Sequence, residues 1–429
     1  MFYPLLLWGI ERFSHVPFWL RMPSLLASMG SVLCLLALGK TTIGYKGAIY
    51  SALILATSPT QIRYAQEVRE YAVTVFLSSL LLVGIIWREA PKTRRRGFFC
   101  IVFFMLLAPL TQYGLVLLAC ATLVTQAVFF FLHTSHSFHR RHLLISALSL
   151  GIAGLCSLLL TLQYQWMAGG FGVTYLEEHY FDPQTHNVIS FIINNSLGLF
   201  KMTFGRTAKS LESIGLIGLS MGLYLFRKDF IKRRNSLVIT TIFAVGINIV
   251  AALFRYYPYG SLRQCIYLTP LLSTVFGVAL GYLATCLDGR RIGKATILIA
   301  MIMLVINAWN IEQINPYQEV ENTKAVIARL NQEMLVEDSV FIHPNAKPAV
   351  MFYLDSFEHL NQHNMFSDSA IMRKPPSGKI WMIFAHMDEP EIEDFINDLP
   401  NTGTIKAILS TEGARLYRFY SQNTENLAP

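Results

Sequence analysis

Long apolar segments dominate the first 309 residues of this 429-residue chain. A helix that crosses a bilayer needs about 20 mostly apolar residues, because the hydrocarbon core offers no partners for unpaired backbone groups. Segments of this length or somewhat shorter lie at 20–39, 47–62, 71–87, 97–110, 114–132, 143–166, 211–226, 236–254, 264–286 and 295–309. The pattern predicts a mainly α-helical, polytopic membrane protein with about ten transmembrane helices.

Basic residues gather in every second connection between these segments. They are Lys40 and Lys46; Arg88, Lys92, Arg94, Arg95 and Arg96; Arg140 and Arg141; Arg227, Lys228, Lys232, Arg233 and Arg234; and Arg290, Arg291 and Lys294. The positive-inside rule places such connections in the cytoplasm. We therefore expect residues 1–19, the connections 57–71, 167–210 and 255–263, and the tail after Asn310 on the extracytoplasmic side.

The charge of the chain changes sign along its length. Residues 1–309 carry a net charge of +16 and residues 310–429 carry −8, which together give the overall +8. This shift predicts a transmembrane domain over 1–309 and a soluble domain over 310–429. Because basic cytoplasmic connections account for the excess of Lys and Arg, no nucleic-acid partner is inferred.

The tail alternates between helical and strand-like patterns. Apolar residues follow a helical period at 318–335, 346–357 and 389–399, and strand-like runs lie at 339–343, 379–385, 404–410 and 414–420. The expected product is a small α/β domain on the extracytoplasmic face.

The cysteines and the common cofactor motifs give little support to soluble chemistry. All six cysteines lie in the apolar part without C-x-x-C spacing, so neither a disulfide scaffold nor a zinc site is expected. The sequence also lacks G-x-x-x-x-G-K-[ST], G-x-G-x-x-G before a helix, and H-E-x-x-H.

The connection TSPTQIRYAQEVREY, residues 57–71, concentrates charge between two apolar segments. At helical spacing, Arg63, Glu67, Glu70 and Tyr71 share one face, so this connection is a candidate site at the membrane surface. The alternative is an interfacial helix cap in which Arg63 simply pairs with Glu67.

A second candidate lies in RYYPYGSLR, residues 255–263. Pro258 and Gly260 are turn residues that hold Arg263 at the entrance of an apolar segment. A guanidinium group suits a phosphate, although an interfacial arginine beside an aromatic belt would have the same sequence.

Several stretches together resemble a known family. In order they are FYPLLLW, WLRMPSLLAS, ATSPTQIRYAQEVREYAV, PLTQYG and YYPYGSLRQCIYLTPLL. They are similar to bacterial polytopic glycosyltransferases of the GT-C class, in the branch of protein mannosyltransferase-like and aminoarabinose transferase-like enzymes. The resemblance implies an integral protein of the bacterial inner membrane. It would transfer a sugar from a polyprenyl-phosphate carrier to a lipid, glycan or protein acceptor on the extracytoplasmic face.

The resemblance also implies roles for individual residues. Glu67, Arg69 and Tyr71 would be catalytic, and Glu67 would be a candidate ligand for a divalent metal cation. Gln66, Glu70, Tyr259 and Arg263 would bind substrate, with Arg263 on the carrier phosphate.

Two departures from the family pattern affect these expectations. Gln112 stands where the family often has the histidine of T-H-Y. Family members also have a span and an outer loop with an essential aspartate before the stretch with which this chain begins. We therefore expect a truncated or misassigned start that lacks roughly one span and one loop, and reduced or no activity without them.

Two other function classes fit an apolar chain of this kind. A transporter or flippase of lipid-linked sugars would tend to have repeated halves and charges at mid-membrane. This chain instead places its acidic residues at one face. A noncatalytic scaffold that presents the acidic tail would not need arginines and acids at the ends of its connections.

Overall fold

The structure is a computed structural model of the whole chain. It describes residues 2–13, 17–40, 44–89, 92–132, 136–168, 180–184, 187–204, 236–286, 322–335, 338–354, 364–367, 379–385, 387, 389–399, 403–411 and 413–421. The chain divides into two compact units, Met1–Ile314 and Asn315–Pro429, and each is described below by itself.

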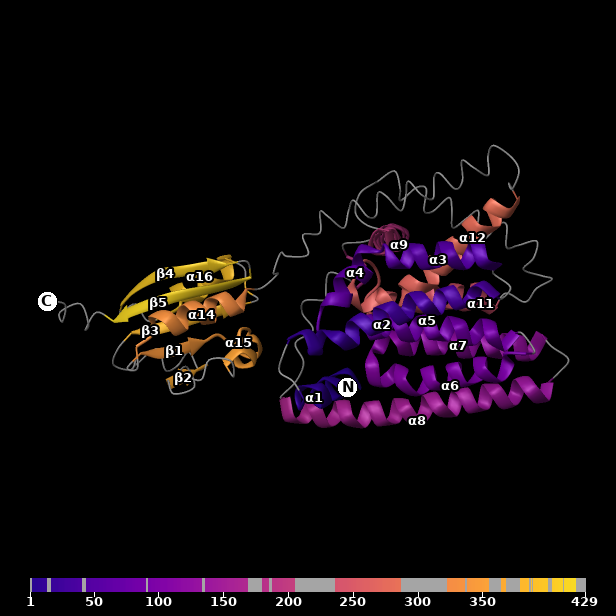
Figure 1. Ribbon diagram of the computed structural model, residues 1–429, viewed down its shortest axis with the longest axis horizontal. Helices are drawn as coiled ribbons and strands as arrows, with labels where there is room; N and C mark the ends of the chain where they lie inside the picture. Colours follow the sequence, from indigo (N-terminus) through magenta and orange to yellow (C-terminus); the bar gives the residue numbers. More distant parts are fainter. Residues whose placement is uncertain are drawn as a thin grey trace. The chain divides into compact units, whose positions relative to one another are not determined.

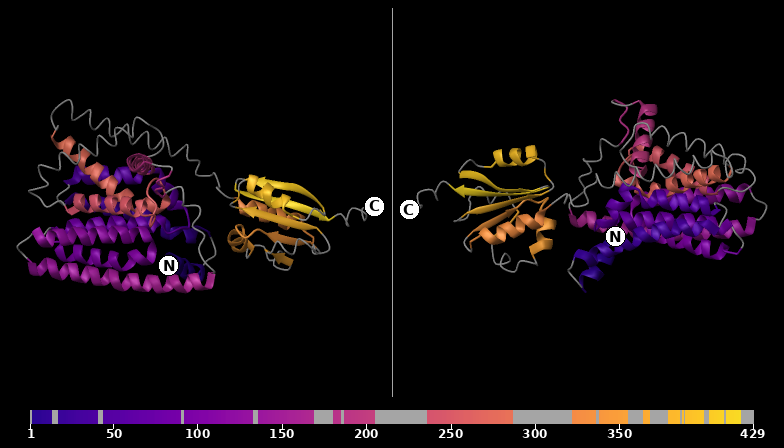
Figure 2. Two further views of the ribbon diagram at one scale, coloured as in Figure 1. Left: turned by 180° about the vertical axis from the view of Figure 1, so that it is seen from behind. Right: turned by 45° about the horizontal axis from the view of Figure 1, so that its top comes forward.

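Every secondary-structure element described in the first unit is a helix. Its helices are α1 (Phe2–Glu11), α2 (Pro17–Ala37), η1 (Leu38–Lys40), α3 (Gly44–Ala56), α4 (Pro59–Gln66), α5 (Tyr71–Glu89), α6 (Arg94–Thr111), α7 (Tyr113–Leu132), α8 (His136–Ala168), α9 (Val188–Phe204), α11 (Ser236–Leu253), η3 (Arg263–Leu268) and α12 (Thr269–Cys286). Helix α5 packs against α2 and α6, and α12 packs against α3, so that the long helices run alongside one another (Figures 1 and 2).

Four helical stretches among the described residues are long and apolar enough to cross a membrane. They are Phe18–Ala37, Tyr71–Glu89, Ser236–Leu253 and Arg263–Gly281. Every apolar segment predicted from the sequence that falls on described residues is mainly helical, which confirms the mainly α architecture. The segments 211–226 and 295–309 lie outside the described residues, so the count of ten spans stays a prediction.

The sequence-based expectation for 167–210 is wrong in one respect. This stretch was expected to be a long connection, but its residues Val188–Phe204 form α9. Phe191, Leu199 and Met202 are buried on this helix, which contacts α3, α4 and α12. The helix is apolar but has only 17 residues, fewer than the roughly 20 of a usual spanning segment.

Small residues bring α3 and α12 into close contact. Gly47 and Ser51 are spaced four residues apart on α3, and Gly277 and Gly281 have the same spacing on α12. The Ser51 hydroxyl donates a hydrogen bond to the carbonyl oxygen of Thr274 at 3.3 Å. Residues without large side chains at this spacing allow two helix backbones to approach closely in a membrane.

The second unit is a five-stranded sheet with helices on both faces. Its strands are β1 (Ser339–Ile342), β2 (Asn364–Phe366), β3 (Ile380–Ala385), β4 (Gly403–Thr411) and β5 (Ala414–Ser421), in the order β2-β1-β3-β5-β4. Strand β1 is parallel to β2 and β3, whereas β5 is antiparallel to β3 and β4.

Alternate residues of these strands bury two apolar clusters. One contains Val340 and Trp381 with α14 (Thr323–Glu333) and α15 (Lys347–Leu354). The other contains Phe341 and Phe384 with α16 (Glu389–Asn397), which lies on the opposite face of the sheet (Figure 2). The small α/β domain predicted from the sequence is therefore confirmed, and only β2 was not predicted.

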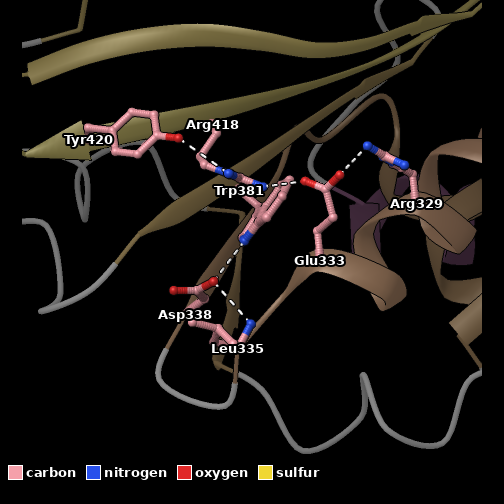
Figure 3. A network of polar contacts seen from close by, with 7 residues as sticks. All are labelled: Arg329, Glu333, Leu335, Asp338, Trp381, Arg418 and Tyr420. Carbon is pink, nitrogen blue, oxygen red and sulfur yellow. Dashed lines mark hydrogen bonds and ion pairs between the residues drawn. The ribbon is translucent and has the colours of Figure 1, made fainter.

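A polar network joins the sheet of this unit to α14 (Figure 3). The buried carboxylate of Asp338 accepts hydrogen bonds from the Trp381 indole at 3.0 Å and from the backbone N–H groups of Leu335 and Lys379. The guanidinium carbon of Arg418 lies 3.8 Å from the Trp381 ring centroid, and Arg418 also pairs with Glu333. The Asp338 carboxylate is hydrogen-bonded through both oxygens, whereas the buried Nε atom of Arg418 has no hydrogen-bond partner, so the Asp338 part of the network contributes most to the stability of the domain.

Candidate functional site

The connection 57–71 forms a corner between two helices. Helix α4 ends at Gln66, and Glu67 follows in extended backbone with φ −88° and ψ 143°. Helix α5 then begins at Tyr71. The single helical face predicted for Arg63, Glu67, Glu70 and Tyr71 is therefore wrong, because the helical path is interrupted after Gln66.

Two arginines flank the Glu67 carboxylate at this corner. Arg63 Nε lies 2.9 Å from one carboxylate oxygen, and Arg69 Nε lies 4.0 Å from the other. The first contact is the Arg63–Glu67 pair that the alternative interpretation of this connection, an interfacial helix cap, expects. The side chains of Arg63, Arg69 and Glu67 are 52%, 45% and 27% exposed. Ion pairs this exposed contribute between about 0 and 1 kcal/mol, so an incoming ligand can readily replace them.

Two buried tyrosines pack against each other on the inner side of this corner. The rings of Tyr64 on α4 and Tyr71 on α5 lie 4.7 Å apart between centroids, and both residues are buried. Arg263 reaches the same place from the start of η3, with its guanidinium carbon 6.0 Å from the Tyr71 ring centroid. This contact is at the outer limit of a cation–π interaction. The structure therefore brings together the two candidate regions of the sequence.

The environment of Tyr64 shows how the charges converge. Burial raises the pKa of its phenol, and Glu67 raises it further, while Arg63, Arg263 and Arg69 lower it. Three guanidinium groups thus act on one ring from α4, from the corner and from η3. This cluster of Arg63, Arg69, Arg263 and Glu67 is called the arginine corner below.

Neighbouring helices hold the backbone of the arginine corner. The Ser24 hydroxyl of α2 donates to the carbonyl oxygen of Arg69 at 3.3 Å, and Ser24 is itself hydrogen-bonded to Tyr3 of α1 at 2.8 Å. Gln61 of α4 donates to the Ser28 hydroxyl of α2 at 2.8 Å. A site fixed by such contacts keeps its charged groups in place before a ligand arrives.

The other predicted site residues lie in different environments. Gln66 is exposed at the end of α4, and Glu70 is half-buried at the start of α5, where its carbonyl oxygen accepts from Thr74. Tyr259 is only 1% exposed, and its hydroxyl is hydrogen-bonded to Ser196 of α9 at 2.9 Å. Burial raises the pKa of Tyr259 to about 12. The structure thus gives Tyr259 a packing contact away from solvent.

Two residues of the corner were not among the predicted site residues. Arg63 was placed on the predicted helical face with Glu67 and as the partner of Glu67, but it was given no role in the site, and Tyr64 was not considered. The sequence signal that indicates the arginine is its helical spacing to Glu67.

The surroundings of Glu67 do not fit a metal ion. Within the part of the chain that the structure describes, no three His, Cys, Asp or Glu residues gather as a ligand set. The carboxylate of Glu67 faces two guanidinium groups, which occupy the place where further ligands would have to lie. Glu67 is therefore placed to pair with guanidinium groups and not to bind a metal ion.

Solved structures with a similar fold cover most of this chain. ArnT from Cupriavidus metallidurans in the apo state is 12% identical, covers 93% of this chain and 83% of its own, and superposes with a TM-score of 0.57. The same protein bound to undecaprenyl phosphate is 13% identical, covers 93% of this chain and 84% of its own, and has a TM-score of 0.55. This chain has the ArnT fold.

The likeness to ArnT is one of fold. No family model and no curated protein sequence matches the chain. Because a fold hosts different chemistries, the activity has to be argued from the arginine corner itself.

Proposed function

We propose that this protein is a membrane glycosyltransferase that uses a polyprenyl-phosphate-linked sugar as donor. The observation that carries the proposal is the arginine corner, where three guanidinium groups and one carboxylate meet at the joint of α4 and α5. Guanidinium groups bind phosphate through paired N–H donors. The ArnT fold supports this reading, since a solved ArnT structure holds undecaprenyl phosphate.

The transfer reaction gives separate roles to Glu67 and to two of the arginines. The acceptor oxygen attacks the anomeric carbon, the bond from that carbon to the phosphate oxygen breaks, and polyprenyl phosphate leaves with the electron pair. Arg263 and Arg69 stabilise the charge that develops on the leaving phosphate. Glu67 accepts the proton of the acceptor hydroxyl once the phosphate has drawn the guanidinium groups away from it.

The membrane placement belongs to the same proposal. About ten spans and the bias of basic connections put the arginine corner and the C-terminal domain on the extracytoplasmic face of the inner membrane. The acceptor is a hydroxyl-bearing lipid, glycan or protein at that face. Dependence on a divalent cation held at residues other than Glu67 stays a prediction, which a chelator tests directly in the transfer assay.

Binding of undecaprenyl phosphate tests the proposal without knowledge of the sugar. The full-length protein in detergent should bind this lipid, and Arg263→Ala should weaken binding about 10- to 100-fold, because a hydrogen bond to a charged group is lost. Arg96→Ala, at an exposed arginine at the start of α6, serves as the matched control and should bind normally. Failure of the wild-type protein to bind would refute the proposal.

Transfer separates the enzyme from a transporter. With a labelled polyprenyl-phosphate sugar, an enzyme releases free polyprenyl phosphate, whereas a flippase moves the intact donor across the bilayer. Glu67→Gln should abolish release while it leaves lipid binding within about threefold of wild type, since the carboxylate acts on the acceptor. Unchanged release by both Glu67→Gln and Arg263→Ala would remove the arginine corner as the site.

A further inference from the structure

The backbone carbonyl oxygen of Gln264 receives hydrogen bonds from two distant side chains. The Tyr257 hydroxyl donates to it at 2.9 Å, and Gln112 Nε2 donates to it at 3.4 Å. Tyr257 lies in the turn after α11, and Gln112 is the residue that caps the end of α6. Three separate segments therefore meet at the residue that follows Arg263.

Gly114 makes room for this arrangement. A Cβ atom at Gly114 would lie 2.6 Å from the Tyr257 hydroxyl oxygen and 2.6 Å from ring carbons of Tyr267. Contacts this short do not occur, so any side chain at position 114 would displace Tyr257 from the Gln264 carbonyl. Only a residue without a side chain fits at position 114, which explains the glycine in the stretch TQYG.

The hydrogen bonds of the turn restrict η3 further. The N–H of Cys265 donates to the carbonyl oxygen of Leu262 at 2.9 Å, and the Cys265 thiol donates to the carbonyl oxygen of Pro258 at 3.2 Å. Burial raises the pKa of Tyr257 well above 10, so its hydroxyl remains a donor across the physiological range. The backbone that carries Arg263 is therefore fixed from both sides.

The side-chain amide of Gln112 is partly buried and only partly hydrogen-bonded. Its side-chain oxygen is buried and has no hydrogen-bond partner, and the same is true of the Gln264 side-chain oxygen. An unpaired buried acceptor lowers stability, so packing alone does not explain an amide at position 112. Among the described residues, the side-chain amide of Gln112 donates its hydrogen bond to the Gln264 carbonyl oxygen.

We propose that Gln112 and Tyr257, with Gly114 as the space they need, are positioning residues that clamp the Gln264 carbonyl and thereby aim Arg263 at the phosphate of the lipid donor. The direction of the Arg263 side chain follows from the backbone of the first turn of η3, which this clamp holds. The inference rests on the proposed function, because it assigns the clamp to the binding of the same phosphate.

Binding of undecaprenyl phosphate to the full-length protein tests the clamp through a double-mutant cycle. Tyr257→Phe removes one donor, and Gln112→Glu removes the other without a change of size. Each should weaken binding about 3- to 10-fold, as expected for one lost hydrogen bond. Gln112→His restores an N–H donor and should recover part of the affinity. Tyr45→Phe, at an exposed tyrosine of α3, is the matched control and should bind normally.

The decisive result is the dependence on Arg263. In an Arg263→Ala background, Tyr257→Phe should cause no further loss, because the clamp acts only through that arginine. An equal loss in both backgrounds, or normal binding by both Tyr257→Phe and Gln112→Glu, would overturn the positioning role while leaving the proposed function intact. A wild-type protein that does not bind undecaprenyl phosphate would overturn both.

Discussion

Substitution of Gly277 by alanine should loosen the contact between α3 and α12. A Cβ atom at Gly277 would lie 2.5 Å from the Ser51 Cα and would also meet the Ser51 backbone nitrogen and hydroxyl oxygen. These neighbours are mostly backbone atoms of α3, which cannot move aside as a flexible side chain can. The two helices must therefore separate along the stretch in which Gly281 also faces the backbone of Gly47.

The magnitude follows from two opposing effects. Overpacking of a well-packed contact costs about 1–3 kcal/mol, and a contact with backbone belongs at the upper end of that range. Alanine in a helix recovers up to about 1 kcal/mol relative to glycine. We therefore expect Gly277→Ala to lower the free energy of unfolding by about 2 kcal/mol.

Gly246 on α11 provides the matched control. Among the described residues outside its own helix backbone, no atom lies within 4 Å of the position of its Cβ, so Gly246→Ala should gain only the helix propensity, about 0.5–1 kcal/mol. Both variants are heated in detergent, and the fraction that remains monodisperse is measured by size-exclusion chromatography. If Gly277→Ala is as heat-resistant as Gly246→Ala, the close contact of α3 and α12 is not the one described.

Other expected outcomes follow from single contacts. Arg255 has φ +60° where α11 ends in a Schellman-type pair of hydrogen bonds, so Arg255→Gly should stabilise the protein by about 1 kcal/mol in the same heating assay. Asp338→Ala leaves the Trp381 indole and two N–H groups unpaired and should destabilise the C-terminal unit by about 3 kcal/mol or more, seen as faster hydrogen exchange in β1 and β3. Burial lowers the pKa of His343 although Glu391 opposes the shift. Below about pH 6.5 the unfolded chain therefore takes up a proton that the folded chain resists, so the C-terminal unit should lose stability on acidification, and His343→Phe should reduce that loss. Exchange rates that do not change with Asp338→Ala, or an acid sensitivity that persists in His343→Phe, would contradict these two expectations.

Local sequence determined the elements of both units. Apolar length alone predicts α2, α5 and α11, because a helix satisfies its own backbone and needs no partner to be recognised. In the C-terminal unit, short apolar or strand-like runs such as Ile380–Ala385 and Ala414–Ser421 predict the strands that the structure shows. The Arg63–Glu67 pair could also be predicted, since the two residues are four apart in one chain.

Only the tertiary structure decided how the site is assembled. The break after Gln66 places Glu67 between two arginines instead of on a helical face, and Arg263 joins Tyr71 from a segment far along the chain. The bond from Gln112 to the Gln264 carbonyl likewise links two helix ends that no sequence period relates. Periodicity and apolar length report on contacts within one element, whereas the meeting of α4, α5 and η3 depends on how close the helices can pack.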